Sequence, residues 1–157
     1  MSSAPKFDPI RTERLLIRAP QADDVDFVWR TRNDPEVAAL EAWSLPFPRE
    51  KAEAIVSSSA ERGGPEPDTW WLAIIQLPDG PVIGELAVHP TWGGRSAEIG
   101  YLLGRDHWGN GYATEATEAL LAWLFDNGTH RASAMLHPDN HASAMVLERT
   151  GFRFEGH

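Results

Sequence analysis

The residues best suited to chemistry lie between Glu98 and Thr114, where β-forming residues give way to a glycine-rich turn and then to helix formers. The turn carries Gly109 and Gly111, and a helix is expected from Tyr112 onward. The first N–H groups of a helix are unpaired and partly positive, and glycine lets an anion approach them closely. The turn therefore predicts a phosphate cradle without a lysine, although two glycines can also serve only a tight strand-to-helix turn.

Two other phosphate-binding patterns fit this turn less well. A Walker loop ends in Gly-Lys-Ser/Thr, whereas Gly111 is followed by Tyr112 and Ala113. A dinucleotide fingerprint needs a third small residue, and Thr114 is a poor one. A nucleotide-binding protein is thus an alternative supported only by the glycine pair.

Three motifs in the same order resemble the GNAT N-acetyltransferases. The run Trp108-Gly109-Asn110-Gly111-Tyr112-Ala113 resembles their acyl-CoA pyrophosphate loop, with Trp108 in place of the usual Arg or Gln. The opening TERLLIR (residues 12–18) and the late NHAS (140–143) leading to Gly151 are similar to further family motifs. The aromatic-glycine start resembles the RimJ/RimL-like branch, which acetylates the N-termini of ribosomal proteins. Because the resemblance covers nearly the whole chain, residues 1–157 are expected to form one GNAT domain.

The resemblance implies that acetyl-CoA is the acyl donor. Its pantetheine arm would pair with the strand at 97–103 in the manner of strand addition, and its pyrophosphate would bind the turn. Asn140 would bond the pantetheine amide, although it is equally a good N-cap for the last helix. The implied donor-binding residues are Tyr101, Leu102, Leu103, Trp108, Gly109, Asn110, Gly111, Tyr112, Ala113, Thr114, Asn140 and Ser143.

The resemblance also assigns catalytic roles. Glu98 is expected to act as the general base, directly or through a water, unless it is simply an exposed strand glutamate. Glu85 and His89 are weaker candidates. Many family members carry a leaving-group tyrosine where this chain has Leu147, so Ser143 is the expected substitute, near the thioester sulfur.

The predicted function is direct transfer of an acetyl group to a primary amine, on a protein N-terminus or a small molecule, through a ternary complex. The chain has no cysteine, which excludes an acyl-cysteine intermediate and cysteine-bound metal, and no metal is expected. The alternative is a non-catalytic acyl-CoA-binding module, which the missing tyrosine at Leu147 favours. The acceptor itself is not indicated.

Composition restricts the classes of partner that the protein can bind and its expected cellular location. The 157 residues suit one domain, and the formal charge of −9 argues against nucleic acid as the main partner. An acidic surface suits amine acceptors or simply solubility. The longest apolar run is too short to span a bilayer and no signal peptide is evident, so we expect a cytoplasmic protein without membrane contact. A homodimer is left open.

The pattern of elements predicts an α+β fold: a mixed, mostly antiparallel sheet with flanking helices and one parallel crossover. The resemblance implies that the parallel pair splays apart, and that the family's final strand is missing after residue 157, which leaves an exposed edge. Strands are predicted at 13–18, 69–76, 82–89, 97–103, 131–136 and 152–155, and helices at 22–32, 49–61, 112–126 and 140–149; residues 2–10 are expected to be a loose lead-in.

Overall fold

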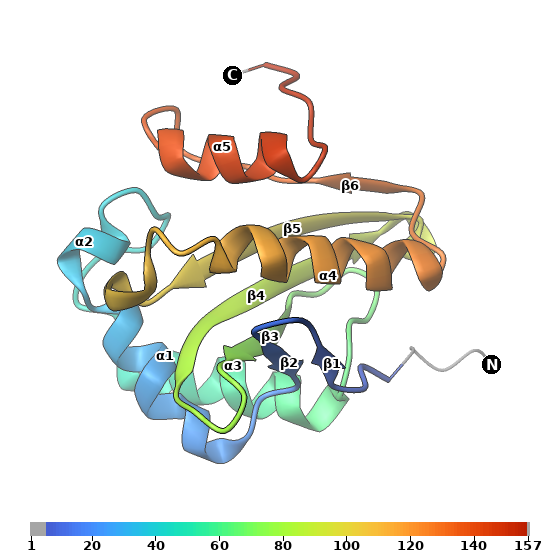
Figure 1. Cartoon of the computed structure of the whole chain (residues 1–157). Helices are drawn as coiled ribbons and strands as arrows, with labels where there is room; N and C mark the ends of the chain where they lie inside the picture. Colours follow the sequence, from blue (N-terminus) through green and yellow to red (C-terminus); the bar gives the residue numbers. More distant parts are fainter. Residues whose placement is uncertain (1–5, 157) are drawn as a thin grey trace.

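The computed structural model describes residues 6–156, which form a six-stranded curled sheet with helices on both faces (Figure 1). The strands lie side by side in chain order, from β1 at one edge to β6 at the other. Neighbours are antiparallel throughout except for β5 and β6, which are parallel. The strands are β1 (Ile10–Arg11), β2 (Leu16–Arg18), β3 (Trp71–Gln76), β4 (Val82–Thr91), β5 (Ser96–Leu103) and β6 (Arg131–Ser133).

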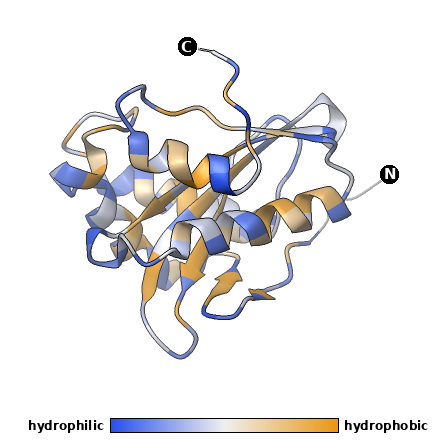
Figure 2. Cartoon of the chain, turned by 45° about the horizontal axis from the view of Figure 1, so that its top comes forward, coloured by the Kyte–Doolittle hydropathy of each residue, from blue (hydrophilic) through white to orange (hydrophobic). Residues whose placement is uncertain are grey.

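Two hydrophobic cores hold the helices against the sheet. In Figure 1, α4 crosses one face of the sheet and α1 and α3 lie on the other; Figure 2 shows the strands between them as the most apolar layer. The first core joins α4 to β3, β4 and β5 through residues such as Leu120 and Ile99. The second joins Val28 of α1 and Val56 of α3 to β3. The helices are α1 (Val25–Arg32), α2 (Pro35–Ala38), α3 (Arg49–Arg62), α4 (Tyr112–Asp126) and α5 (His141–Arg149).

The helix ends follow local sequence signals. α3 begins after Pro48 and ends at Gly63, whose φ of 71° places it in the left-handed region that glycine tolerates. α5 begins at Asn140, whose side chain accepts a hydrogen bond from the amide of Ser143. These signals fix the ends of α3 and the start of α5.

The predicted fold class is confirmed, and so are most elements. Two short elements were not predicted: β1, which begins at Ile10 at the end of the expected loose lead-in, and α2, which begins at Pro35 directly after its N-cap Asp34. The side chain of Asp34 in fact caps α2 by accepting from the amide of Glu36 at 3.0 Å.

The predicted final strand at 152–155 is wrong, because these residues are not in a strand of the described sheet. β6 is also shorter than expected and ends at Ser133. The first three positions of β5 pair with β6, as Ser96 with Arg131, Ala97 with Ala132 and Glu98 with Ser133. Beyond Glu98, β5 pairs only with β4, so the parallel seam is open along residues 99–103.

Among residues 6–156 no helix has the length and apolar character needed to cross a bilayer. That part of the chain also has no group of three or more His, Cys, Asp or Glu placed to hold a metal ion.

Candidate active site

The glycine-rich turn connects the open end of β5 to α4. Gly109 and Gly111 both have φ of 79°, and Gly111 is the N-cap of α4 without any side-chain cap. The first N–H groups of α4 therefore have no intrahelical partner and no competing side chain. The indole Nε1 of Trp108 donates to the carbonyl of Leu103 at 3.0 Å, which ties the turn to the end of β5.

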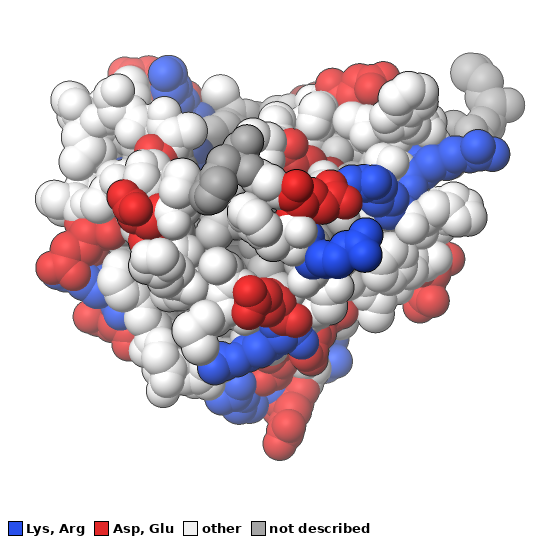
Figure 3. Space-filling view, turned by 90° about the horizontal axis from the view of Figure 1, so that it is seen from above, with Lys and Arg blue, Asp and Glu red and all other residues white. Residues whose placement is uncertain are grey.

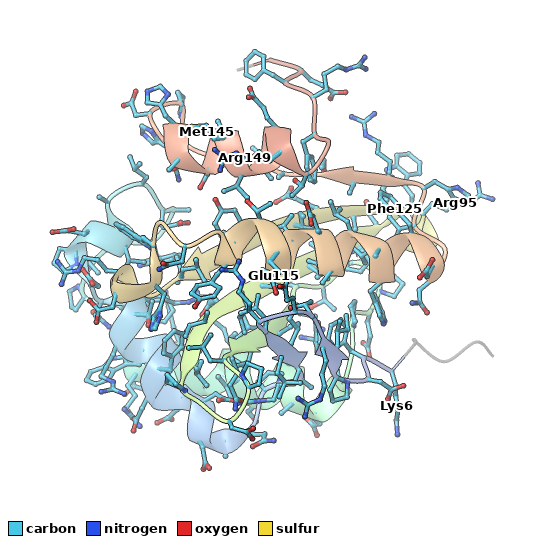
Figure 4. The ribbon with its side chains drawn as sticks, in the orientation of Figure 1. Lys6, Arg95, Glu115, Phe125, Met145 and Arg149 are labelled. Carbon is cyan, nitrogen blue, oxygen red and sulfur yellow. The ribbon has the colours of Figure 1, made fainter. Side chains whose placement is uncertain are left out.

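A contact that the sequence did not predict fixes the turn from the other side. Arg14, in the loop between β1 and β2, donates from Nη1 to the carbonyl of Asn110 at 2.8 Å and from Nε to Oε1 of Glu115 at 2.7 Å. The hydroxyl of Thr12 also donates to Glu115. Figure 4 shows Glu115 projecting from α4 toward this loop. The TERLLIR motif was noted as a match, but nothing local in it reveals a partner one hundred residues away.

The charge of Glu115 is favoured by these contacts. Burial opposes its ionisation, but the hydrogen bonds from Thr12 and from the Arg14 backbone and side chain, with the charge of Arg14, lower the pKa of Glu115 below its usual value. Arg14 also stacks over the ring of Tyr112 at 4.6 Å from its centroid. Arg14 therefore holds both sides of the turn.

The residues predicted to bind the donor fall into one region. Tyr101, Leu102 and Leu103 lie along the open seam of β5, and the turn follows them directly. The backbone groups that face away from β4 in this seam have no strand partner there, which is the geometry that an extended pantetheine arm needs for strand addition. The seam and the unobstructed N-terminus of α4 thus fit acetyl-CoA; Ala113 and Thr114 lie in the first turn of α4.

Tyr101 and Ser143 meet across the open seam. The phenol of Tyr101 donates to the hydroxyl of Ser143 at 2.9 Å. Burial raises the pKa of Tyr101, the Ser143 bond opposes this, and the charge of Glu41 adds to it. The phenol is therefore protonated at neutral pH. Leu147, at the position of the expected tyrosine, is a buried apolar residue on the same helix.

Glu98 lies outside the open part of the seam. It occupies the last paired position of β5, opposite Ser133 on one side and His89 on the other. It is three positions from Tyr101, which corresponds to about 10 Å along a strand. The structure therefore places Glu98 at the closed end of the seam and not beside the Tyr101–Ser143 pair.

A second polar group lies between the sheet and the loop after α2. Arg32, at the end of α1, donates from Nη2 to Oε1 of Glu85 on β4 at 2.5 Å. Burial raises the pKa of Glu41 to about 7, the charge of Glu85 adds to this and Arg32 opposes it. Glu85 was a weak candidate from sequence; neither Glu41 nor Arg32 carried a signal, because their partners are far away in the chain.

Figure 3 views the molecule from the side of α5 and shows acidic and basic side chains interspersed with neutral ones.

Comparisons with known proteins identify the family and the fold. A family model described as an acetyltransferase (GNAT) domain matches residues 14–153. The chain is 32% identical to the uncharacterized N-acetyltransferase p20 of Bacillus licheniformis, over 95% of this chain and 84% of the relative.

Two solved structures share the fold. One is an acetyltransferase of the GNAT family from Bacillus anthracis, with a TM-score of 0.80 and 27% identity over 95% of this chain and 86% of that one. The other is RimL, a ribosomal-protein alpha-N-acetyltransferase in complex with coenzyme A, with a TM-score of 0.78 and 21% identity over 95% and 86%.

Proposed function

The chain belongs to the GNAT acetyltransferase family, and from this premise we propose that it transfers the acetyl group of acetyl-CoA directly to a primary amine. The observation that carries the proposal is the parallel pair β5–β6, which is closed at three positions and open along residues 99–103 beside the free N-terminus of α4. The open seam suits the pantetheine arm, and the N-terminus of α4 suits the pyrophosphate.

We assign the donor's contacts as follows. The backbone of Tyr101, Leu102 and Leu103 pairs with pantetheine, and the turn from Trp108 to Thr114 surrounds the pyrophosphate. The side chain of Asn140 caps α5 through Oδ1, and its Nδ2 donates to the pantetheine amide carbonyl. The N–H near Tyr101 stabilises the oxyanion that forms when the amine attacks.

Ser143 donates the proton to the leaving thiolate. Tyr101 then donates its own proton to Ser143. A hydroxyl that accepts a hydrogen bond from one group can donate its own proton to another. The 2.9 Å bond between the two side chains supports this relay, and the protonated phenol supplies it. The pair takes over the role of the tyrosine that Leu147 replaces.

Glu98 stays a proposed base that acts through water, because its position at the closed end of the seam puts it outside direct reach of Ser143. Replacement of Glu98 by Gln is expected to lower turnover while acetyl-CoA binding persists. Unchanged turnover would remove Glu98 from the mechanism.

The acceptor class is tested directly. The protein is incubated with acetyl-CoA and a panel of N-terminal peptides, amino acids, polyamines and aminoglycosides, and release of the CoA thiol is followed. Transfer to at least one amine supports the proposal. Stabilisation by CoA in a thermal-shift assay without transfer to any amine would favour the non-catalytic acyl-CoA-binding module instead, and stabilisation by ATP or NAD but not by CoA would contradict both.

A further inference from the structure

Arg105 joins the segment before the glycine-rich turn to the start of α2. It lies in η3 (Arg105–His107), the short 3-10 helix between β5 and the turn. Its Nε lies 3.3 Å from Oδ2 of Asp34, and its Nη1 lies 3.0 Å from Oε1 of Glu36. Figure 1 shows α2 next to the connection from β5 to α4. One side chain therefore ties the proposed donor site to an element from much earlier in the chain.

The carboxyl group of Asp34 that binds Arg105 also starts α2. Its Oδ1 accepts a hydrogen bond from the amide of Glu36 at 3.0 Å, and the carbonyl of Asp34 accepts from the amide of Ala38 at 2.9 Å. α2 is a single turn of four residues, and so short a helix depends on its cap and its contacts for order. The position of Arg105 therefore acts directly on the first turn of α2.

Packing between η3 and α1 is incomplete. A cavity of about 260 Å³ separates them, and Arg105 and Asp34 lie on its walls. The other lining residues are Phe27, Arg30, Thr31, Gly104, Asp106 and His107. A cavity gives the atoms on its walls nothing to pack against, so the two ion pairs of Arg105 hold η3 to α2 where side-chain packing does not.

The three charged side chains are too exposed for these pairs to serve mainly as stabilisers of the fold. The exposed fractions are 51% for Arg105, 20% for Asp34 and 62% for Glu36. Ion pairs in water contribute little to the free energy of unfolding. A small free energy is nevertheless enough to favour one position of a short segment over another by a few fold.

We infer that Arg105 is a positioning residue that couples the donor turn to α2: coenzyme A bound at the turn orders α2, and ordered α2 favours coenzyme A. The inference rests on the proposed donor site. Linkage makes the two effects equal in size, because each is the same coupling free energy seen from one end. Holding the turn in place before the donor arrives reduces the ordering cost of binding. Arg105 acts through Asp34 and Glu36 and needs no contact with the donor.

A direct attraction between Arg105 and the donor phosphates makes the opposite prediction for the carboxylates. If Arg105 acted only as a nearby cation, removal of the charges of Asp34 and Glu36 would strengthen coenzyme A binding, because two negative charges near an anionic ligand would disappear. If Arg105 acts through α2, the same change weakens binding. The sign of the effect therefore separates the two mechanisms.

The test measures the Kd for coenzyme A by calorimetry in Arg105→Ala, Arg105→Lys, the double variant Asp34→Asn/Glu36→Gln and all three changes Arg105→Ala/Asp34→Asn/Glu36→Gln together. Asparagine keeps the N-cap of α2 while it removes the charge. The matched control is Arg30→Ala, because Arg30 lines the same cavity, donates from Nε to the Asp26 carbonyl of its own helix, and forms no ion pair in the described part of the chain.

We expect Arg105→Ala and the double carboxylate variant each to raise the Kd about three- to fivefold. The combination of all three changes should raise it no further, since either change alone already breaks the link. Arg105→Lys should recover part of the loss, because lysine keeps the charge but not the fork that reaches two carboxylates. Arg30→Ala should stay within about twofold of wild type.

Hydrogen exchange of α2 measures the coupling without turnover. Saturating coenzyme A should slow exchange of the amides from Glu36 to Ala38 in the wild type and in Arg30→Ala, and should have no such effect in Arg105→Ala. A merely structural role of Arg105 would change exchange equally with and without coenzyme A, and the response to the ligand would stay as in the wild type.

The outcomes distinguish the inference from the proposed function. If the wild type does not bind coenzyme A, the proposed function fails. If it binds and protects the open seam, but Arg105→Ala keeps the response of α2 or the wild type shows none, the inference is overturned while the proposed function stands. Tighter binding by the double carboxylate variant also overturns it. If that variant does not fold, as judged by its melting curve, Arg105→Ala and Arg105→Lys decide.

Discussion

At the scale of single residues, the Tyr101 hydroxyl makes a hydrogen bond that the packing of its ring does not require. It reaches across the seam to Ser143, whereas its ring packs with the first core. We expect Tyr101→Phe to lower kcat by about a hundredfold, in the range of general acid catalysis, with the Kd for acetyl-CoA unchanged. Steady-state kinetics and calorimetry check this. An unchanged kcat would show that the proton reaches the thiolate by another route.

Glu41 also makes a prediction for stability. Its pKa is about 7 in the folded chain and near 4.5 when unfolded, so the folded state binds the proton more tightly. The contribution of protonated Glu41 to the free energy of unfolding is fully present below the pKa of Glu41 in the unfolded chain. It is lost as the pH rises through 7. Because glutamine cannot lose a proton, Glu41→Gln should become more stable relative to wild type between about pH 5 and about pH 8.

Urea unfolding of the two proteins across this pH range measures that difference. Glu36→Gln is the matched control, because it removes one carboxylate charge from an exposed side chain of the same segment. A pH dependence of Glu41→Gln no larger than that of Glu36→Gln would contradict the raised pKa of Glu41.

At the scale of elements, the β1–β2 loop fixes the turn that precedes α4. Arg14 binds the Asn110 carbonyl and Glu115, and its Nη2 would lie 3.3 Å from a Cβ at Gly111. We expect Arg14→Ala to raise the KM for acetyl-CoA about tenfold with little change in kcat, because the turn loses its position but the reacting groups remain. Arg11→Ala is the control, since Arg11 lies on β1 and makes no ion pair within residues 6–156. Equal KM values for the two variants would refute this role of Arg14.

The elements that sequence predicted well are those whose signals are local. α4 and α5 were placed correctly because a glycine turn, an N-cap asparagine and helix-forming residues stand next to each other. α2 was missed because Asp34–Pro35 both ends α1 and starts a new helix. The strand at 152–155 was wrongly predicted because β-forming residues need a neighbouring strand, and residues 6–156 supply none there.

The features of the site also differ in whether local sequence or long-range contact determines them. The turn and the Asn140 cap follow from residues close in sequence, whereas the bond between Tyr101 and Ser143 joins residues 42 positions apart. The Arg32–Glu85 pair spans 53 positions, and no periodicity or spacing reveals which carboxylate meets which cation. Long-range pairing was therefore the part of the site that required a structure.

At the scale of the whole molecule, the open seam predicts which backbone amides a bound donor protects from hydrogen exchange. In residues 99–103 the amides that do not point toward β4 have no partner strand. Saturating CoA should slow hydrogen exchange of these amides and of the first turn of α4, because strand addition gives them acceptors. Residues 74–76 of β3, which are paired on both sides, should be unaffected. Protection elsewhere, with none in the seam, would place the donor at another site.

The contact between Arg14 and Glu115 joins positions 101 residues apart. Contacts between residues so far apart in sequence form slowly, because the loop between them must be closed before the contact contributes free energy. We therefore expect the proposed donor site at this turn to form late in folding, so that a partly folded chain does not bind coenzyme A even when α5 is formed. Refolding protein should gain affinity for coenzyme A only after the β1–β2 hairpin has packed against the N-terminus of α4. The hairpin that carries Arg14 would then control when the chain becomes competent to bind the donor.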